Sequence, residues 1–426
     1  MSQFPKGFLI GASTAAHQVE GNNVHSDYWT MEQMRSTSFL EPSGDAVDHY
    51  NRYEEDINYL KEAGLNAYRF SIEWARIEPA EGHFNESEIS HYERMLDYCR
   101  DNGVEPIVTL HHFTSPKWLI EKGGWESEDT VDYFARYCSY VAEKLGAKMK
   151  YVCTINEANM GLQLSLIAKR YMRQLIFGKK KQTDGKAQVG VNLQHMIENM
   201  KLAKVENVEV FGLEKLNTFV ASRTEKGDLL IARAHVAAKA AIKKAAPNLK
   251  VGLTLSLHDM QYNKLGKGHA MKEWYREFGH YLPYIKDDDF LGVQNYTRYE
   301  FGLFGQKEPP RGAEMTQMNY EFYPEAIGNV VNTVAKDFKG EILITENGIA
   351  TGDDNRRCEF IKRAMAGVKK CLENGINVVG YCHWSLLDNF EWQKGYSMTF
   401  GLIAVDRKTQ ARSPKRSLYL LGEYAK

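Results

Sequence analysis

The segment EILITEN (Glu341–Asn347), the helical pattern over Glu359–Asn374 and the segment NVVGYCHWSL (Asn377–Leu386) decide the fold class. The two outer segments are short, apolar and rich in β-branched or aromatic residues, which is typical of buried strands. The helical pattern between them ends at Asn374-Gly375, and glycine commonly follows the last turn of a helix. Two strands joined through a helix predict a parallel βαβ unit.

The same alternation recurs along the chain. Apolar runs of strand length begin at Phe8, Asn66, Glu105, Tyr151, Lys250, Asp289, Glu341 and Asn377. Helical patterns cover Tyr53–Ala63, Glu86–Arg100, Val131–Leu145, Asp228–Lys244, Tyr323–Ala335, Glu359–Asn374 and Lys415–Tyr424. Eight strands alternating with helices predict an α/β protein with a closed (β/α)8 TIM barrel rather than an open sheet. No linker, low-complexity tract or internal repeat interrupts the sequence, so we expect a single domain over residues 1–426.

The composition excludes several classes of protein. A formal net charge of −1 gives no electrostatic reason to expect a nucleic acid or an anionic membrane as a partner. No apolar run reaches the roughly 18–20 residues of a membrane span, and the opening MSQFPKGFLIGAS lacks the features of a signal peptide. The six cysteines show no metal-binding spacing and indicate reduced thiols. We therefore expect a cytoplasmic protein, and the sequence leaves its oligomeric state open.

Polar and aromatic residues gather where the predicted strands end. Active sites of (β/α)8 barrels form at the carboxyl ends of the strands, so these residues are expected on one rim. They are Gln18, Glu20, Arg69, His111, His112, Asn156, Glu157, Tyr296, Glu346, Asn347 and Trp384.

The segment Met160–Thr224 is the least regular part of the chain. It contains Lys179, Lys180 and Lys181 in a row and an apparent turn at Asp184-Gly185. It is either a solvated excursion after the fourth strand or a wall or lid over the site, because long loops on barrels are often functional. The sequence does not decide between these interpretations.

Two carboxylates on this rim suggest a chemistry. Glu157 follows the strand ending in TIN, and Glu346 follows the strand ending in LIT. Glycoside hydrolysis requires such a pair, in which one carboxylic acid protonates the departing oxygen. The other carboxylate attacks the anomeric carbon in a retaining enzyme, or activates water in an inverting one. The negative charge of the second carboxylate would raise the pKa of the acid, and Arg69 would keep the second carboxylate ionised.

The other rim residues suit a sugar. Hydrogen bonds to ring hydroxyls are expected from Gln18, His112, Asn156 and Glu391. Trp384 and Trp392 offer flat apolar faces for stacking. Adjacent strand residues point to opposite faces, so only one of His111 and His112 should face the pocket. Such an adjacent pair is also a poor geometry for one metal ion, and we expect neither a metal nor a cofactor.

At these residues the sequence resembles glycoside hydrolase family 1, the β-glucosidase and β-galactosidase family. The resemblance extends over seven ordered motifs: FLIGASTAAHQVEG, YRFSIEWARIEP, VTLHHFTSPKWL, TINEAN, GVQNYTR, ITENG and WSLLDNFEWQKGYSMTFGLIAVD. It implies that Glu157 is the acid/base, that Glu346 is the nucleophile, and that Arg69 and Tyr296 contact the nucleophile. The sugar-binding residues that it implies are Gln18, His112, Asn156, Trp384, Glu391, Trp392 and Phe400.

Some positions depart from the family's usual pattern. Ala158 replaces a proline after the acid/base, Phe113 replaces a tryptophan, and Thr399 replaces an arginine. Gln294 and Asn295 stand where the family often has Asn and Tyr. These changes concern the leaving-group side more than the two glutamates.

Two comparisons within the family narrow the substrate. Members that act on 6-phosphorylated sugars hold the phosphate with a serine, a lysine and a tyrosine, at positions that resemble Glu391, Met398 and Phe400 here. A carboxylate would repel a phosphate and methionine supplies no cation, so we expect a non-phosphorylated glycone. The thioglucosidase branch has glutamine in place of the acid/base, and Glu157 argues against that branch.

The mechanism implied by the resemblance is double displacement with retention of configuration. The two carboxyl groups should then lie roughly 5–5.5 Å apart. We expect hydrolysis of small β-glycosides, with β-glucosides such as cellobiose first, β-galactosides second and β-fucosides as a further option. Two alternatives stay open: transglycosylation, in which another sugar intercepts the intermediate, and a catalytically silent sugar-binding barrel.

Overall fold

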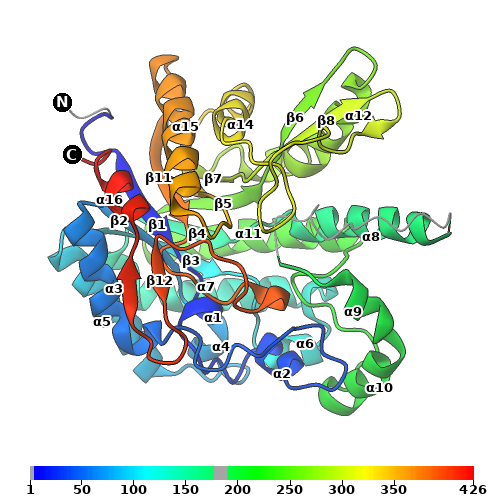
Figure 1. Ribbon diagram of the computed structural model, residues 1–426. Coiled ribbons are helices and arrows are strands. Elements are labelled where there is room, and N and C mark those ends of the chain that lie inside the picture. Colours follow the sequence, from blue (N-terminus) through cyan, green and yellow to red (C-terminus); the bar gives the residue numbers. More distant parts are fainter. Residues whose placement is uncertain (1–3, 177–189) are drawn as a thin grey trace.

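A closed eight-stranded parallel barrel forms the centre of the computed structural model, which describes residues 4–176 and 190–426 (Figure 1). The strands are β1 (Leu9–Ser13), β2 (Ala67–Ser71), β3 (Glu105–His111), β4 (Tyr151–Ile155), β5 (Lys250–Ser256), β7 (Phe290–Gln294), β10 (Glu341–Gly348) and β11 (Val378–Trp384). They pair in that order, and β11 closes the barrel onto β1. Each coincides with one of the eight predicted apolar runs, so the predicted TIM barrel is confirmed.

Helices on the outside of the barrel match the predicted helical patterns. They are α3 (His49–Ala63), α5 (Glu86–Asp101), α7 (Thr130–Leu145), α11 (Glu225–Ala245), α14 (Ala326–Val334), α15 (Asp354–Glu373) and α16 (Arg416–Gly422). The α11 helix begins before the predicted Asp228, because the Thr224 side chain caps it by accepting the Gly227 N–H. The α14 helix begins after the predicted Tyr323, since a residue before proline is biased away from helical geometry.

Further helices and strands lie in the loops around the barrel. The remaining α-helices are α1 (Ala16–Val19), α2 (Asp27–Glu32), α4 (Trp74–Ile77), α6 (Lys117–Glu121), α8 (Met160–Ile176), α9 (Leu193–Glu198), α10 (Met200–Phe211), α12 (Lys267–Trp274) and α13 (Leu282–Ile285). The remaining strands are β6 (Asp259–Tyr262), β8 (Arg298–Gly302), β9 (Gly305–Gln306), β12 (Ile403–Val405) and β13 (Arg412–Pro414). No helix within the described ranges is both long and apolar enough to span a membrane.

The irregular segment Met160–Thr224 is largely helical where the structure describes it. The α8, α9 and α10 helices lie outside the barrel (Figure 1), and the loop from Gly212 leads to α11. The predicted turn at Asp184-Gly185 and the lysines 179–181 lie outside the described residues.

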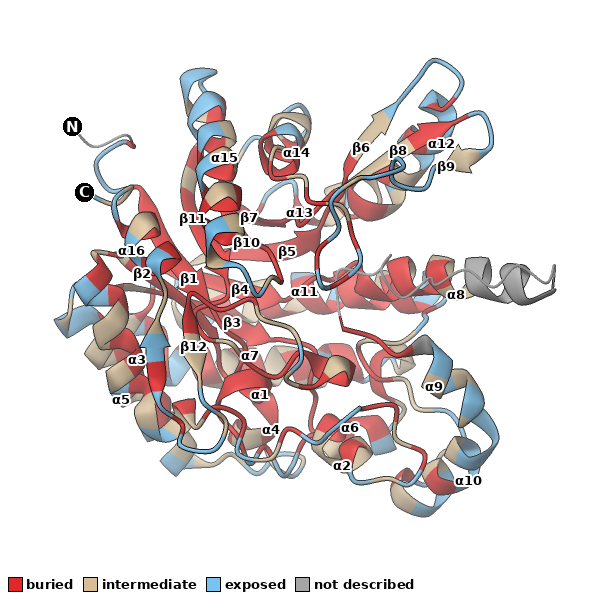
Figure 2. Ribbon diagram, viewed as in Figure 1, coloured by how far each residue is buried: buried red, intermediate tan, exposed pale blue. Residues whose placement is uncertain are grey.

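Side chains of the barrel strands alternate between two apolar clusters. Residues from seven of the eight strands, among them Ala67, Phe290 and Cys382, form one small cluster. Their strand neighbours Tyr68 and Leu291 belong instead to the large cluster that includes the outer helices. Because successive strand residues point to opposite faces, the small cluster fills the interior of the barrel. Figure 2 shows the strands buried, while the helices expose their outer faces.

Candidate active site

One small pocket at the carboxyl ends of the strands brings together most of the predicted site residues. Its lining is His112, Phe113, Asn156, Glu157, Tyr296, Glu346, Trp384, Glu391, Trp392 and Phe400. Arg69 lies directly beneath it and is fully buried. Gln18 lies beside it, where its Nε2 donates to the Phe390 carbonyl oxygen at 2.7 Å.

The strand register explains why Arg69 and Gln294 point into the pocket. Arg69 comes two residues after Ala67, and Gln294 four residues after Phe290, so both lie on the interior face of the barrel. Strand β10 follows a different rule. Its register against β7 shifts between Ile344 and Glu346. An extra residue of this kind re-aims the side chain that follows it, which accounts for the orientation of Glu346.

Three donors surround the Glu346 carboxylate. Arg69 Nη1 lies 2.6 Å from Oε1, Gln294 Nε2 donates to the same oxygen at 3.0 Å, and the Tyr296 hydroxyl donates to Oε2 at 2.6 Å. Burial raises the pKa of Glu346, but the Arg69 cation and the hydrogen bonds of Tyr296 and Arg69 oppose that rise. Contacts of this kind favour the ionised carboxylate, which is the form that a nucleophile needs.

Glu157 has a contrasting environment. Burial and the negative charge of Glu346 raise its pKa well above the ordinary range, while a hydrogen bond with Ser256 opposes this in part. Its backbone adopts a left-handed conformation with φ of 44°, and its N–H donates to Thr254 Oγ1 at 2.9 Å. Of the two carboxyl groups, Glu157 therefore has the surroundings that favour the protonated form, which is the form that a general acid needs.

Asn156 orients the neighbouring histidine. Its Oδ1 accepts from Arg69 Nη2 at 2.6 Å and from Gln294 Nε2 at 2.7 Å, so its Nδ2 is left to donate to His112 Nε2 at 3.1 Å. Burial lowers the pKa of His112 well below the ordinary range, and the ring is neutral. A neutral ring that accepts at Nε2 carries its hydrogen on Nδ1, which has no partner within the described protein. His112 is one of the residues that line the pocket.

Glu391 and two indole rings complete the pocket. Burial raises the pKa of Glu391 to about 8, against a backbone hydrogen bond from Gly190 and a side-chain bond with Gln18. The Gly190 N–H donates to Oε1 at 3.2 Å, while Oε2 is buried without a partner among the described residues. The His112 ring stacks near both indoles, with centroids 5.7 Å from Trp384 and 6.0 Å from Trp392.

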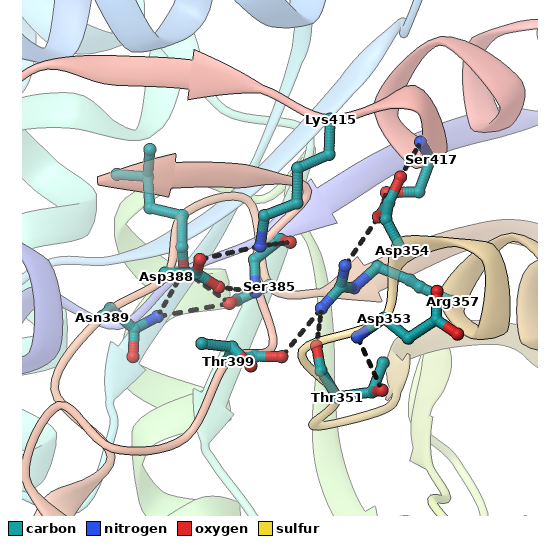
Figure 3. A network of polar contacts seen from close by, with 12 residues as sticks. Thr351, Asp353, Asp354, Arg357, Ser385, Asp388, Asn389, Thr399, Lys415 and Ser417 are labelled. Carbon is teal, nitrogen blue, oxygen red and sulfur yellow. Dashed lines mark hydrogen bonds and ion pairs between the residues drawn. The ribbon is translucent and has the colours of Figure 1, made fainter. Parts of the chain in front are cut away.

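A polar network anchors the loop that carries Glu391, Trp392 and Phe400 (Figure 3). Lys415 Nζ donates to Asp388 Oδ2 at 2.7 Å and to the Gly401 carbonyl oxygen at 2.8 Å. The buried Arg357, on α15, donates to the carbonyl oxygens of Thr351 and Thr399 at 2.7 and 2.8 Å. The loop is therefore tied at both ends to the elements outside the barrel.

Three of the predicted rim residues point elsewhere. His111 Nε2 pairs with Ser115 Oγ at 3.0 Å, and His112 is the one histidine of the pair that lines the pocket. Glu20 forms an ion pair with Arg76, with 2.8 Å between Oε2 and Nε. Asn347 donates to the Asn295 carbonyl oxygen at 2.6 Å.

The sequence interpretation missed two contacts of the pocket. Gln294 departs from the family pattern, and its place at the end of a predicted strand is a signal for the rim. No motif or strand end in the sequence indicated that Gly190 would contact Glu391. Within the described ranges, no group of His, Cys, Asp or Glu side chains is arranged to hold a metal ion.

The sequence model described as "Glycosyl hydrolase family 1" matches residues 1–426. The chain belongs to glycosyl hydrolase family 1. It is 30% identical to the "Beta-glucosidase A" of Acetivibrio thermocellus, over 99% of this chain and 98% of that protein. It is 27% identical to a "6-phospho-beta-galactosidase" of Staphylococcus aureus, over 99% and 98% of the two chains. The crystal structure of the β-glycosidase BGL167 superposes with a TM-score of 0.86 at 41% identity, covering 99% of this chain and 97% of that one.

These similarities confirm the predicted family and its chemistry. The family is one of retaining β-glycosidases, so this member is a glycoside hydrolase with the double-displacement reaction. Some relatives are named as β-glucosidases and others as 6-phospho-β-galactosidases. The residues of the pocket must therefore indicate whether the substrate of this enzyme carries a phosphate.

Proposed function

We propose that this family 1 enzyme hydrolyses small, non-phosphorylated β-glucosides, with Glu346 as the nucleophile and Glu157 as the acid/base. The observation that carries the assignment is the unequal surroundings of the two carboxyl groups. The Glu346 carboxylate accepts hydrogen bonds of 3.0 Å or less from Arg69, Tyr296 and Gln294. The negative charge of Glu346 in turn favours the protonated form of Glu157.

In the first step, a Glu346 oxygen forms a bond to the anomeric carbon as the bond to the leaving oxygen breaks. Glu157 gives its proton to that oxygen, so the alcohol leaves neutral and a glycosyl ester of Glu346 forms. Arg69 and Tyr296 hold the carboxylate in place before the attack. Proton loss from Glu157 is easier at this stage, because the negative charge of Glu346 is consumed in the new bond.

In the second step, the ionised Glu157 takes a proton from water, and the water oxygen attacks the anomeric carbon. The ester bond breaks, Glu346 regains its charge, and the sugar leaves with its original configuration. A separation of roughly 5–5.5 Å between the two carboxyl groups is expected for this reaction.

The surrounding residues would bind the glycone. Gln18, His112, Asn156 and Glu391 offer hydrogen bonds to its hydroxyls, and the unpartnered His112 Nδ1 and Glu391 Oε2 support this role. Trp384, Trp392 and Phe400 supply apolar walls for the C–H faces of the ring.

The pocket favours an unphosphorylated hexose. At the three positions that hold phosphate in the 6-phospho branch, this chain has Glu391, Met398 and Phe400, and none supplies a cation. Relatives named as β-glucosidases support glucosides as the first choice. Galactosides are the second choice. We also propose that residues 1–426 act as one catalytic domain. All six cysteines are free and buried, which supports a reducing, cytoplasmic compartment.

Two variants test the roles. Glu346→Gln should abolish hydrolysis of a p-nitrophenyl β-glucoside, and full activity in this variant would sink the nucleophile assignment. Glu157→Ala should regain turnover of an activated substrate when azide is added, with a β-glycosyl azide as product. No azide effect would count against the acid/base role. Product analysis at high sugar concentration distinguishes hydrolysis from transglycosylation.

A further inference from the structure

The backbone at Glu157 is held in an unfavourable conformation. A φ of 44° places this residue in the left-handed region, which costs a residue other than glycine roughly 1–2 kcal/mol. Such a conformation persists only where the surroundings impose it. In the family pattern a proline follows the acid/base and stiffens the chain, whereas this chain has Ala158.

Hydrogen bonds restrain the peptide at Ala158 in place of a proline ring. The Ala158 N–H donates to the Thr254 carbonyl oxygen at 3.1 Å, a bond that proline cannot make. The Ala158 carbonyl oxygen accepts from Arg223 Nη1 at 3.4 Å. The Tyr281 hydroxyl lies 3.4 Å from the same carbonyl oxygen, but its hydrogen goes to the nearer Asp228 Oδ2 at 2.6 Å. Arg223 is thus the main donor to this carbonyl.

Arg223 is buried with little electrostatic compensation. Only 2% of its side chain is exposed, and the carboxylate of Asp228 lies 3.9 Å from Nη1. Nη2 donates to the Phe219 carbonyl oxygen at 2.5 Å, and the guanidinium lies 4.5 Å from the centre of the Phe219 ring. Burying a guanidinium costs several kcal/mol unless close partners compensate it. Packing alone does not account for an arginine at this place.

The Arg223 guanidinium also packs against the first turn of α8 at Gly161. A methyl group on Gly161 would lie 2.4 Å from Arg223 Nε and 2.6 Å from Cζ. Glycine at 161 therefore leaves the space that the guanidinium fills, beside the peptide that follows Glu157.

We propose that Arg223, held by the carbonyl oxygen and the ring of Phe219, is a positioning residue. It holds the peptide after Glu157 and restrains the chain where the family's usual proline is missing. The inference rests on the proposed role of Glu157. It also gives a function to the loop from Gly212 to Thr224, which carries Arg223 beside the site.

Loss of this restraint should impair proton donation more than nucleophilic attack. Misplacing a catalytic group by about 1 Å can cost about a hundredfold in rate. A phenyl β-glucoside needs the acid, since phenoxide is a poor leaving group. A 2,4-dinitrophenyl β-glucoside does not, since its phenolate departs unprotonated. A variant that only misplaces Glu157 should therefore hydrolyse the phenyl glucoside more slowly and the dinitrophenyl glucoside at nearly the normal rate.

The test compares kcat/KM for the two substrates in Arg223→Met. We expect a loss of about tenfold to a hundredfold on the phenyl glucoside and less than about threefold on the dinitrophenyl glucoside. Arg223→Lys, which keeps the charge but not the planar fork, should fall between. The matched control is Arg233→Met on α11, because Arg233 is exposed and pairs with Glu128 on the surface. A 2-deoxy-2-fluoro-glucosyl inactivator, which traps the nucleophile, gives the fraction of active protein in each preparation.

Gly161→Ala offers a second route, which keeps Arg223 and only displaces its guanidinium. Alanine favours the helix, so this variant should fold even where Arg223→Met does not. It should show the same selective loss, and the double variant should lose little more than either single one. Equal losses on both substrates, or no loss on either, would overturn the proposal. Glu157→Ala is measured alongside: if it lacks the selective loss, the acid/base assignment fails rather than the restraint.

Discussion

Gln294 offers a sharp test of how the nucleophile is kept ionised. Its carboxamide donates to Glu346 Oε1 at 3.0 Å and to Asn156 Oδ1 at 2.7 Å. Methionine has nearly the same length and shape but no N–H. Gln294→Met therefore removes one donor from the anionic carboxylate and leaves Arg69 and Tyr296 in place.

The size of the effect follows from the remaining contacts. A hydrogen bond to a charged group contributes roughly 1.5–3 kcal/mol. Since one pKa unit corresponds to about 1.36 kcal/mol, the pKa of Glu346 should rise by about one to two units. The lower end is expected, because the Gln294 bond is the longest of the three and Arg69 still contacts the same oxygen at 2.6 Å.

The assay is the pH dependence of kcat/KM on an aryl β-glucoside. Glu346 must be deprotonated to attack, so the acidic limb should move up by about one pH unit. The alkaline limb reports the proton on Glu157 and should stay in place. Gln410→Met is the control, because that carboxamide bonds Asp45 outside the pocket. An acidic limb that stays fixed or moves to lower pH would refute the reasoning.

Three further outcomes are expected. Gly190→Ala should lower kcat/KM for β-glucosides, because its methyl group would lie 2.4 Å from the Glu391 carbonyl oxygen; unchanged kinetics would contradict this contact. Arg412→Met should lower the free energy of unfolding in urea by about 3–5 kcal/mol, since it leaves the buried Asp56 carboxylate with His49 but without the guanidinium. Lys144→Met, which breaks an exposed pair, should cost about 1 kcal/mol or less, and equal costs would argue against the burial reasoning. Finally, kcat/KM should be higher for p-nitrophenyl β-glucoside than for its 6-phosphate, and the reverse order would exclude the proposed glycone.

Local patterns were sufficient to predict the barrel. Each strand carries its own apolar run, and each helix its own apolar stripe and end signal, so their bounds agree with the structure to within a few residues. The start of α14 was wrong because Pro324 acts on the residue before it, a local effect that the apolar pattern does not contain. Of His111 and His112 only His112 lines the pocket, although strict alternation from Ile107 would turn His111 inward.

The site was predicted only in part. The seven motifs identified the residues that line the pocket, because the identity of a side chain is a property of the sequence. Its orientation is not: strict alternation from Leu343 would turn Glu346 outward, and the register shift of β10 turns it into the pocket.

The sequence by itself determined the barrel, the two glutamates and the family. The tertiary structure decided which residues support them. Gln294 reaches Glu346 across 52 positions of the chain, Arg223 reaches Ala158 across 65, and Gly190 reaches Glu391 across 201. Strand and helix patterns depend on neighbours within a few residues. A hydrogen bond in the pocket depends instead on how the barrel closes and which loops meet at its rim, and no local pattern records that.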